Sequence, residues 1–167
     1  MKVLTVLHSL TGHTLYVVNK VNDKLKENGI QVDLEKLEPI GGENKNEMNF
    51  ERIRLKPKYN VRDYDVIIIA GPVRGFSMSV VIKAYLMSLL TLDGKKVVCV
   101  VTHFFPIASM GGTNAIKQMK KEIDDLGGEV LDTEIINWKG FGREKKINAA
   151  VTTIVNRLME PEEQVQE

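Results

Sequence analysis

VLTVLHSLTGHT, residues 3–14, joins an apolar run typical of a buried β-strand to a short loop rich in hydroxyl groups. The loop carries three hydroxyl side chains, Ser9, Thr11 and Thr14, around Gly12. Apolar residues then recur at helical spacing, so the loop stands at the start of a helix. Hydroxyl groups, free backbone N–H groups and a helix N-terminus together suit a phosphate. The stretch therefore predicts a phosphate cradle without a lysine, for a tightly held cofactor rather than a nucleotide that is turned over.

Strand and helix patterns alternate along the rest of the chain. We expect strands at residues 3–7, 31–37, 66–70, 97–102 and 130–136, and helices at residues 15–25, 80–92, 116–126 and 147–158. Such alternation demands parallel strands joined by right-handed crossovers, with helices on both faces of the sheet. The predicted fold class is therefore α/β.

One segment interrupts the alternation. Residues 38–63 are rich in Gly, Asn, Lys and Arg, and only residues 48–53 hint at a helical turn. We expect a long, partly irregular connection there. With no internal repeat and no second domain, residues 1–159 are predicted to form one domain, followed by an acidic, disordered tail at residues 160–167.

Composition narrows the function classes. Of 167 residues, 43% are hydrophobic and 27% charged, which is typical of a soluble globular protein. The net charge is +1, and four of the carboxylates lie in the tail, so the body is mildly basic but falls short of a nucleic-acid footprint. No apolar stretch suits a membrane span and no signal sequence is evident, which predicts a cytoplasmic protein without membrane contact. Cys99, within an apolar run, is predicted to be a buried thiol.

Three loops are the predicted ligand-binding segments, because an open parallel sheet binds ligands outside the carboxyl ends of its strands. They follow the first, third and fourth strands and comprise residues 9–14, 71–78 and 102–112. One hydroxyl is enough to cap a helix, so three around a glycine favour a phosphate site over a simple cap. No catalytic residue and no metal ligand is predicted. The candidate ligand-binding residues are Ser9, Leu10, Thr11, Gly12, His13, Thr14, Pro72, Val73, Arg74, Gly75, Phe76, Ser77, Met78, Thr102, His103, Phe104, Phe105, Gly111 and Gly112.

These motifs resemble those of a known family. Residues 9–14 are similar to the Ser/Thr-x-Thr-Gly-x-Thr phosphate loop of the flavodoxins. Residues 70–73, 77–79 and 83–86 resemble the Gly-x-Pro-Val, Ser and Lys-Ala-Phe-Leu segments of flavodoxin-like proteins and of NAD(P)H:quinone oxidoreductase relatives. The resemblance runs from Lys2 to about Leu158 and implies a flavodoxin-like three-layer sandwich, with five parallel strands in the order 2-1-3-4-5.

The resemblance also implies a ligand, flavin mononucleotide (FMN), held without a covalent bond. Residues 9–14 would bind its phosphate, residues 72–78 would line the isoalloxazine ring near N5, and residues 102–105 would contact the pyrimidine side. Phe76, with Phe104 or Phe105, would be the aromatic pair that sandwiches the ring. The flavin would then carry the electrons, and the protein would orient it and tune its potential.

Three functions are open at this stage. The first is an electron carrier that works with a redox partner protein, although such flavodoxins are typically acidic and this body is basic. The second is an NAD(P)H-dependent reductase of a quinone or another small acceptor, and the third is a non-redox interaction module. A homodimer is compatible with each. The chain lacks the Gly-x-Gly-x-x-Gly of dinucleotide-binding domains and the Gly-Lys-Ser/Thr of P-loop enzymes, which excludes those two classes.

Overall fold

A single parallel sheet organises the computed structural model, which describes residues 1–105, 107 and 109–161. Its strands are ordered β2-β1-β3-β4-β5, and every neighbouring pair is parallel. Both the predicted α/β class and the predicted strand order are therefore confirmed. The strands are β1 (Lys2–Leu7), β2 (Gln31–Lys36), β3 (Val66–Pro72), β4 (Lys96–His103) and β5 (Glu129–Asn137).

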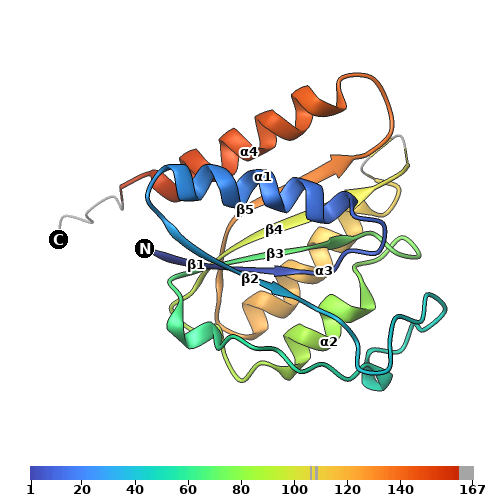
Figure 1. Ribbon diagram of the computed structural model, residues 1–167. Coiled ribbons are helices and arrows are strands. Elements are labelled where there is room, and N and C mark those ends of the chain that lie inside the picture. Colours follow the sequence, from blue (N-terminus) through green and yellow to red (C-terminus); the bar gives the residue numbers. More distant parts are fainter. Residues whose placement is uncertain (106, 108, 162–167) are drawn as a thin grey trace.

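Helices cover both faces of this sheet, as Figure 1 shows. α1 (His13–Glu27) and α4 (Arg143–Met159) pack on one face, and α2 (Val80–Ser88) and α3 (Gly112–Asp125) pack on the other. Successive residues of a strand point to opposite faces. Ile67 therefore joins the core beneath α2 and α3, whereas Ile68 joins the core beneath α1 and α4. Because β1, β3 and β4 are buried on both faces, their sequences are almost continuously apolar.

The connection between β2 and β3 is irregular, as predicted, with two short 3₁₀ turns at Phe50–Arg52 and Val61–Asp63. Polar side chains of β2 fasten it to the sheet edge. The buried carboxylate of Glu35 accepts hydrogen bonds from the backbone N–H groups of Lys58 and Tyr59, at 2.7 and 2.9 Å. The connection is thus a fixed part of the domain despite its polar composition.

The second helix is shorter than the apolar pattern predicts. α2 ends at Ser88, whose hydroxyl donates to the carbonyl of Tyr85, and Leu89 is extended. Leu92 is nevertheless fully buried. Leu89 and Leu92 therefore cover the core from a loop, and periodicity alone does not distinguish such a loop from a helix.

Three further expectations concern the cysteine, the C-terminal tail and membrane spans. Cys99 is a buried free thiol, as predicted, and burial raises its pKa to about 12. The tail expected to be disordered lies largely outside the described residues, from residue 162 onward. Among the helices that the structure describes, none combines the length and apolarity needed to cross a bilayer.

Gly71, near the end of β3, gives a test of core packing. A Cβ atom there would lie 2.8 Å from Cγ1 of Ile82, on the adjacent helix α2. We expect Gly71→Ala to lower the free energy of unfolding by about 1–3 kcal/mol through overpacking. Urea denaturation measures this change. Ile82→Ala should cost less in the Gly71→Ala protein than in the wild type, because the added methyl fills part of the cavity, and strictly additive effects would contradict this packing.

Candidate functional site

The loops that follow β1, β3 and β4 gather at the carboxyl edge of the sheet, on the right in Figure 1. We call this edge the rim. The strand order reverses between β1 and β3, so the chain leaves β1 toward α1 on one face and leaves β3 toward α2 on the other. Loops that diverge in this way leave a crevice at the edge of an open sheet. The structure thus brings the three predicted loops to one place.

The first loop leaves part of the N-terminus of α1 free. Gly12 precedes α1 with a φ of 86°, a left-handed conformation that favours glycine, and as the N-cap residue it supplies no side-chain hydrogen bond to the helix. Instead, the hydroxyl of Ser9 accepts from the N–H groups of Gly12 and Leu15, at 3.2 and 3.4 Å. The N–H groups of Thr11, His13 and Thr14 find no acceptor among the described residues. The first turn of α1 also lacks acidic side chains, so its amides are available to an anion.

The three hydroxyl groups of this loop have different positions. Thr11 is exposed, whereas Thr14 is buried and shares a 2.8 Å hydrogen bond with the hydroxyl of Thr102 at the end of β4. Ser9 holds the loop backbone, as described above. Only Thr11 therefore presents its hydroxyl to solvent, while Thr14 ties the first loop to the third.

The second loop contains a tight turn with an unusual backbone. Arg74 and Ser77 exchange two backbone hydrogen bonds, at 2.8 and 2.9 Å, and both intervening residues have positive φ, 53° at Gly75 and 58° at Phe76. That conformation is costly for an aromatic residue. Side chains of α3 hold the turn, since Asn114 donates to the Phe76 carbonyl and Gln118 accepts from the N–H of Met78.

The second and third loops touch directly. The ring of Phe105 stacks on that of Phe76, with centroids 5.0 Å apart and an interplanar angle of 21°. Gly111 makes this approach feasible, because a Cβ atom there would lie 2.7 Å from Val73 and 2.8 Å from the Cα of Phe76. The predicted aromatic candidates Phe76 and Phe105 thus stack on each other and leave no room for a ring between them, which differs from the predicted sandwich, and both are partly exposed.

Other predicted residues lie away from the crevice. Met78 is buried in the core beneath α2 and α3, and His103 is 4% exposed, with burial lowering the pKa of its imidazole. Gly112 packs against β5, where a Cβ atom would lie 2.7 Å from Ile135. Leu10 lines a small cavity between the first loop and the connection from β2 to β3. These four residues pack behind the loops and support them.

A fourth loop, between β5 and α4, also reaches the rim, although none of its residues was among the predicted ligand-binding residues. The indole of Trp138 stacks on the imidazole of His13, with centroids 4.1 Å apart and an interplanar angle of 16°. The guanidinium of Arg143 also lies over the ring of Trp138, 4.5 Å from its centroid, and donates to the Trp138 carbonyl. Phe104 completes the cluster with a tilted contact on His13, at 4.9 Å. The signal in the sequence was the run Trp138–Arg143, an aromatic and basic segment broken by two glycines.

Sequence reasoning also missed a buried polar relay beneath the first loop. Nδ1 of His8 lies 2.6 Å from the hydroxyl of Ser79, and Nε2 lies 2.7 Å from a carboxylate oxygen of Glu43. Ser79 caps α2 and accepts from the N–H groups of Val81 and Ile82, so its own proton is free to donate to Nδ1. A neutral imidazole protonated on Nε2 satisfies every partner. The relay joins the first loop, α2 and the connection from β2 to β3.

This relay is not suited to hydrolysis. Ser79 is 2% exposed and its oxygen is occupied by two backbone N–H groups, so it cannot approach a substrate as a nucleophile. Burial lowers the pKa of His8, against the opposing influence of Glu43. The arrangement therefore positions loops and keeps the imidazole neutral.

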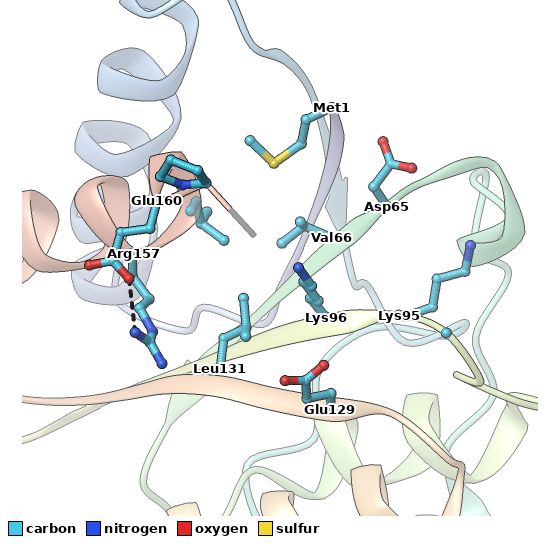
Figure 2. A pocket seen from close by; sticks show the side chains of 12 residues that line it. Met1, Asp65, Val66, Lys95, Lys96, Glu129, Leu131, Arg157 and Glu160 are labelled. Atoms are coloured by element: carbon cyan, nitrogen blue, oxygen red, sulfur yellow. Dashed lines mark hydrogen bonds and ion pairs between the residues drawn. The ribbon is translucent and has the colours of Figure 1, made fainter. Parts of the chain in front are cut away.

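A large cavity lies at the opposite, amino edge of the sheet (Figure 2). It measures about 1170 Å³ and is lined by both acidic and basic side chains. Arg157 pairs with Glu160 at 2.9 Å, and Lys95 donates to backbone carbonyls, so these cations already have partners within the fold. The residues that the structure describes contain no cluster of His, Cys, Asp and Glu able to hold a metal ion. The rim is thus the better candidate for ligand binding.

Solved structures share this fold. The chain is similar to the two-electron reduced flavodoxin of Megasphaera elsdenii, with 23% identity, a TM-score of 0.60, and coverage of 90% of this chain and 98% of that one. Flavodoxin 1 of Bacillus cereus gives 11% identity and a TM-score of 0.66, over 96% and 99% of the two chains. A flavodoxin, WrbA-like protein of Agrobacterium tumefaciens gives 12% identity and 0.63, over 93% and 95%. No protein-family model and no curated protein sequence matches the chain. The flavodoxin-like fold is therefore shown.

The relay gives a prediction of pH dependence. Because burial lowers the pKa of His8 from 6.5, the unfolded chain takes up a proton at a pH where the folded protein does not. The stability is full above the unfolded pKa and is lost as the pH falls below it. We expect the free energy of unfolding to decrease between about pH 8 and pH 5.5, as measured by urea denaturation at each pH.

Two variants separate His8 from the other histidines. His8→Gln should make the pH profile shallower but not flat, since His13 and His103 also have a lowered pKa and keep their own contributions. Glu43→Gln should keep it at least as steep, because the carboxylate that raises the pKa of His8 is gone. A profile that Glu43→Gln flattens as much as His8→Gln would contradict the neutral relay.

Proposed function

We propose that the chain binds FMN at the rim and acts as a redox protein that transfers electrons through the non-covalently bound flavin. The observation that carries this proposal is the combination, at one crevice, of free amides at a helix N-terminus with aromatic side chains on two adjoining loops. A ligand that carries both an anionic group and a flat ring would fit that combination. The flavodoxin-like fold supports the proposal without establishing the ligand.

The residues of the first loop fit a phosphate. The N–H groups of Thr11, His13 and Thr14 lack acceptors among the described residues, and a Cβ atom built on Gly12 would meet nothing within 4 Å. Open space, free donors and the positive end of the helix dipole are the three features that an anion needs there. The exposed hydroxyl of Thr11 would add a further donor. His8 beneath the loop is held neutral. The negative charge of the phosphate would therefore be balanced by the helix dipole and the hydrogen-bond donors of the loop.

The second and third loops fit a planar ring. Phe76 and Phe105 offer aromatic faces at the crevice, and the turn from Arg74 to Ser77 presents backbone groups beside them. Once bound, a flavin supplies the electron chemistry. The protein would orient the ring, shield one part of it from water and set its hydrogen bonds.

The phosphate assignment is tested with two ligands that differ only in the phosphate. FMN and riboflavin are titrated separately into the protein, and quenching of Trp138, the one tryptophan, reports binding. Thr11→Val removes a hydrogen bond to a charged group, so we expect FMN to bind roughly 10- to 150-fold more weakly. Riboflavin affinity should hardly change. An equal loss for both ligands, or no saturable FMN binding by the wild type, would overturn the assignment.

A second function, NAD(P)H-dependent reduction of a quinone or another small acceptor, is favoured by the cations Arg74, Lys139 and Arg143 at the rim, which suit dinucleotide phosphates. Mixing the FMN-loaded protein with NADPH or NADH without air distinguishes the two. We expect a carrier to keep its flavin oxidised until dithionite is added. Rapid bleaching of the flavin absorbance by either nucleotide would instead assign the reductase.

A further inference from the structure

Exposed aromatic side chains concentrate at the rim. Four of the five phenylalanines of the chain lie in its loops and are at least one third exposed: Phe76, Phe104, Phe105 and Phe141. An isolated exposed apolar side chain needs no explanation, but several at one edge indicate an interaction site. A flavin would cover only those in contact with its ring. The remaining aromatic surface needs another occupant.

Phe141 is the most exposed of the four. Its side chain is fully exposed, and it stands between Gly140 and Gly142, which have φ angles of 109° and 73°. We call residues 139–143 the tip. The tip rises from a rigid base, because Trp138 is stacked on His13 directly before it. A fully solvated phenylalanine on an ordered base is preorganised to enter a pocket on a partner.

The charge around the tip is positive. Residues 139–146 contain four cationic side chains and one carboxylate, Glu144. That carboxylate is bound by Lys20 and by the hydroxyl of Tyr16. Lys139 lies over the ring of Phe104, and no carboxylate lies within ion-pair distance of Lys139 or Arg143 in the described part of the chain. The available charge at the tip is therefore cationic.

The carboxylates on the other side of the crevice are engaged. Glu43 contacts His8 at 2.7 Å, and Glu47 is only 17% exposed and lies 3.9 Å from Arg52. Arg74, which lines the same small cavity as these two carboxylates, donates to a backbone carbonyl and has no ion-pair partner among the described residues. A partner approaching the rim would thus meet aromatic rings surrounded by cations.

We propose that the tip and the exposed phenylalanines of the rim form the docking surface for an acidic redox protein. The inference rests on the proposed function, because electrons leave or enter a bound flavin at the rim. Cations would steer the acidic partner and set its orientation, and the aromatic rings would supply the buried contact. The surface has the opposite charge to that of an acidic carrier, so it selects partners with carboxylates around their own redox centre.

Small redox proteins of known charge test the sign of this surface. In stopped flow, a reduced acidic [2Fe–2S] ferredoxin gives one electron to the oxidised flavin, and the reduced flavin gives one electron to basic ferric cytochrome c. Between about 10 and 300 mM salt, we expect the first rate constant to fall and the second to rise, because screening weakens attraction in one pair and repulsion in the other. A cytochrome c rate that falls with added salt would overturn the proposal.

Charge reversal locates the surface. Lys139→Glu with Lys145→Glu should lower the ferredoxin rate at low salt by about tenfold or more and raise the cytochrome c rate. The matched control is Lys24→Glu with Lys26→Glu, an equal change of charge at the far end of α1. Phe141→Ser should weaken the ferredoxin complex without altering the salt dependence. Equal effects of the two charge reversals would show that net charge, and not the tip, controls docking.

A flavin-independent measurement separates this proposal from the proposed function. Carbodiimide cross-linking of the apoprotein to the same ferredoxin should join its carboxylates to Lys139 or Lys145, as identified by peptide mass spectrometry, and Phe141→Ser should reduce the yield. A chain that binds no FMN but gives this cross-link would retain the docking surface and lose the redox function. Cross-links elsewhere, or Phe141-dependent binding to phosphatidylglycerol vesicles, would overturn the docking proposal, the latter in favour of a membrane surface.

Discussion

The position of β1 between β2 and β3 is the constraint on which the rim depends. Backbone pairing continues to the last residue before the first loop, since the N–H of Leu37 donates to Leu7 at 2.7 Å and that of His8 donates to Ala70 at 2.9 Å. The start of the loop is therefore fixed to two neighbouring strands. Because the chain then leaves β1 and β3 toward opposite faces, the crevice follows from the strand order rather than from any single side chain.

The first loop can attract an anion without a cationic side chain of its own. Its donors are the free amides of Thr11, His13 and Thr14, and Ser9 orders the loop by accepting from the N–H groups of Gly12 and Leu15. A protonated histidine below the loop would compete with this arrangement, because it would donate toward Ser79 and leave that hydroxyl proton without an acceptor. Burial keeps His8 neutral and the relay intact. Electrostatics and hydrogen bonding thus favour the same protonation state.

Periodicity predicted the fold well because burial on two faces leaves a strong signal. β3 and β4 are continuous apolar runs, and the helices repeat apolar residues at their own spacing. The loops that meet at the rim were also predictable, since strand ends at one edge follow from topology. What the sequence could not show was contact between distant segments. Glu43 reaches His8 only because residues 38–63 are anchored to the edge strand by Glu35.

Contacts between distant segments also explain why two residues have other roles than their local sequence pattern predicts. Thr14 belongs to a phosphate-loop motif, yet its hydroxyl contacts Thr102, 88 positions away in the sequence. Leu92 continues a helical pattern but is buried from a loop, because α2 ends where Ser88 bonds to its last turn. The spacing of apolar residues along the chain indicates which side chains are buried. It does not specify which distant residues those side chains contact. The polar contacts of this site join distant residues, so the spacing could not predict them.

The two sides of the crevice are built for rigidity at a cost in stability. Phe76 keeps a positive φ and an exposed ring, although both features oppose folding, and Asn114 with Gly111 holds it there. On the other side, the stack of His13, Trp138 and Arg143 fixes the base of a tip whose phenylalanine gains nothing from the folded chain. An apolar core buried on both faces of the sheet supplies the stability that these features consume. Strain and exposure persist where a ligand or partner can relieve them, and here both lie on one edge of the molecule.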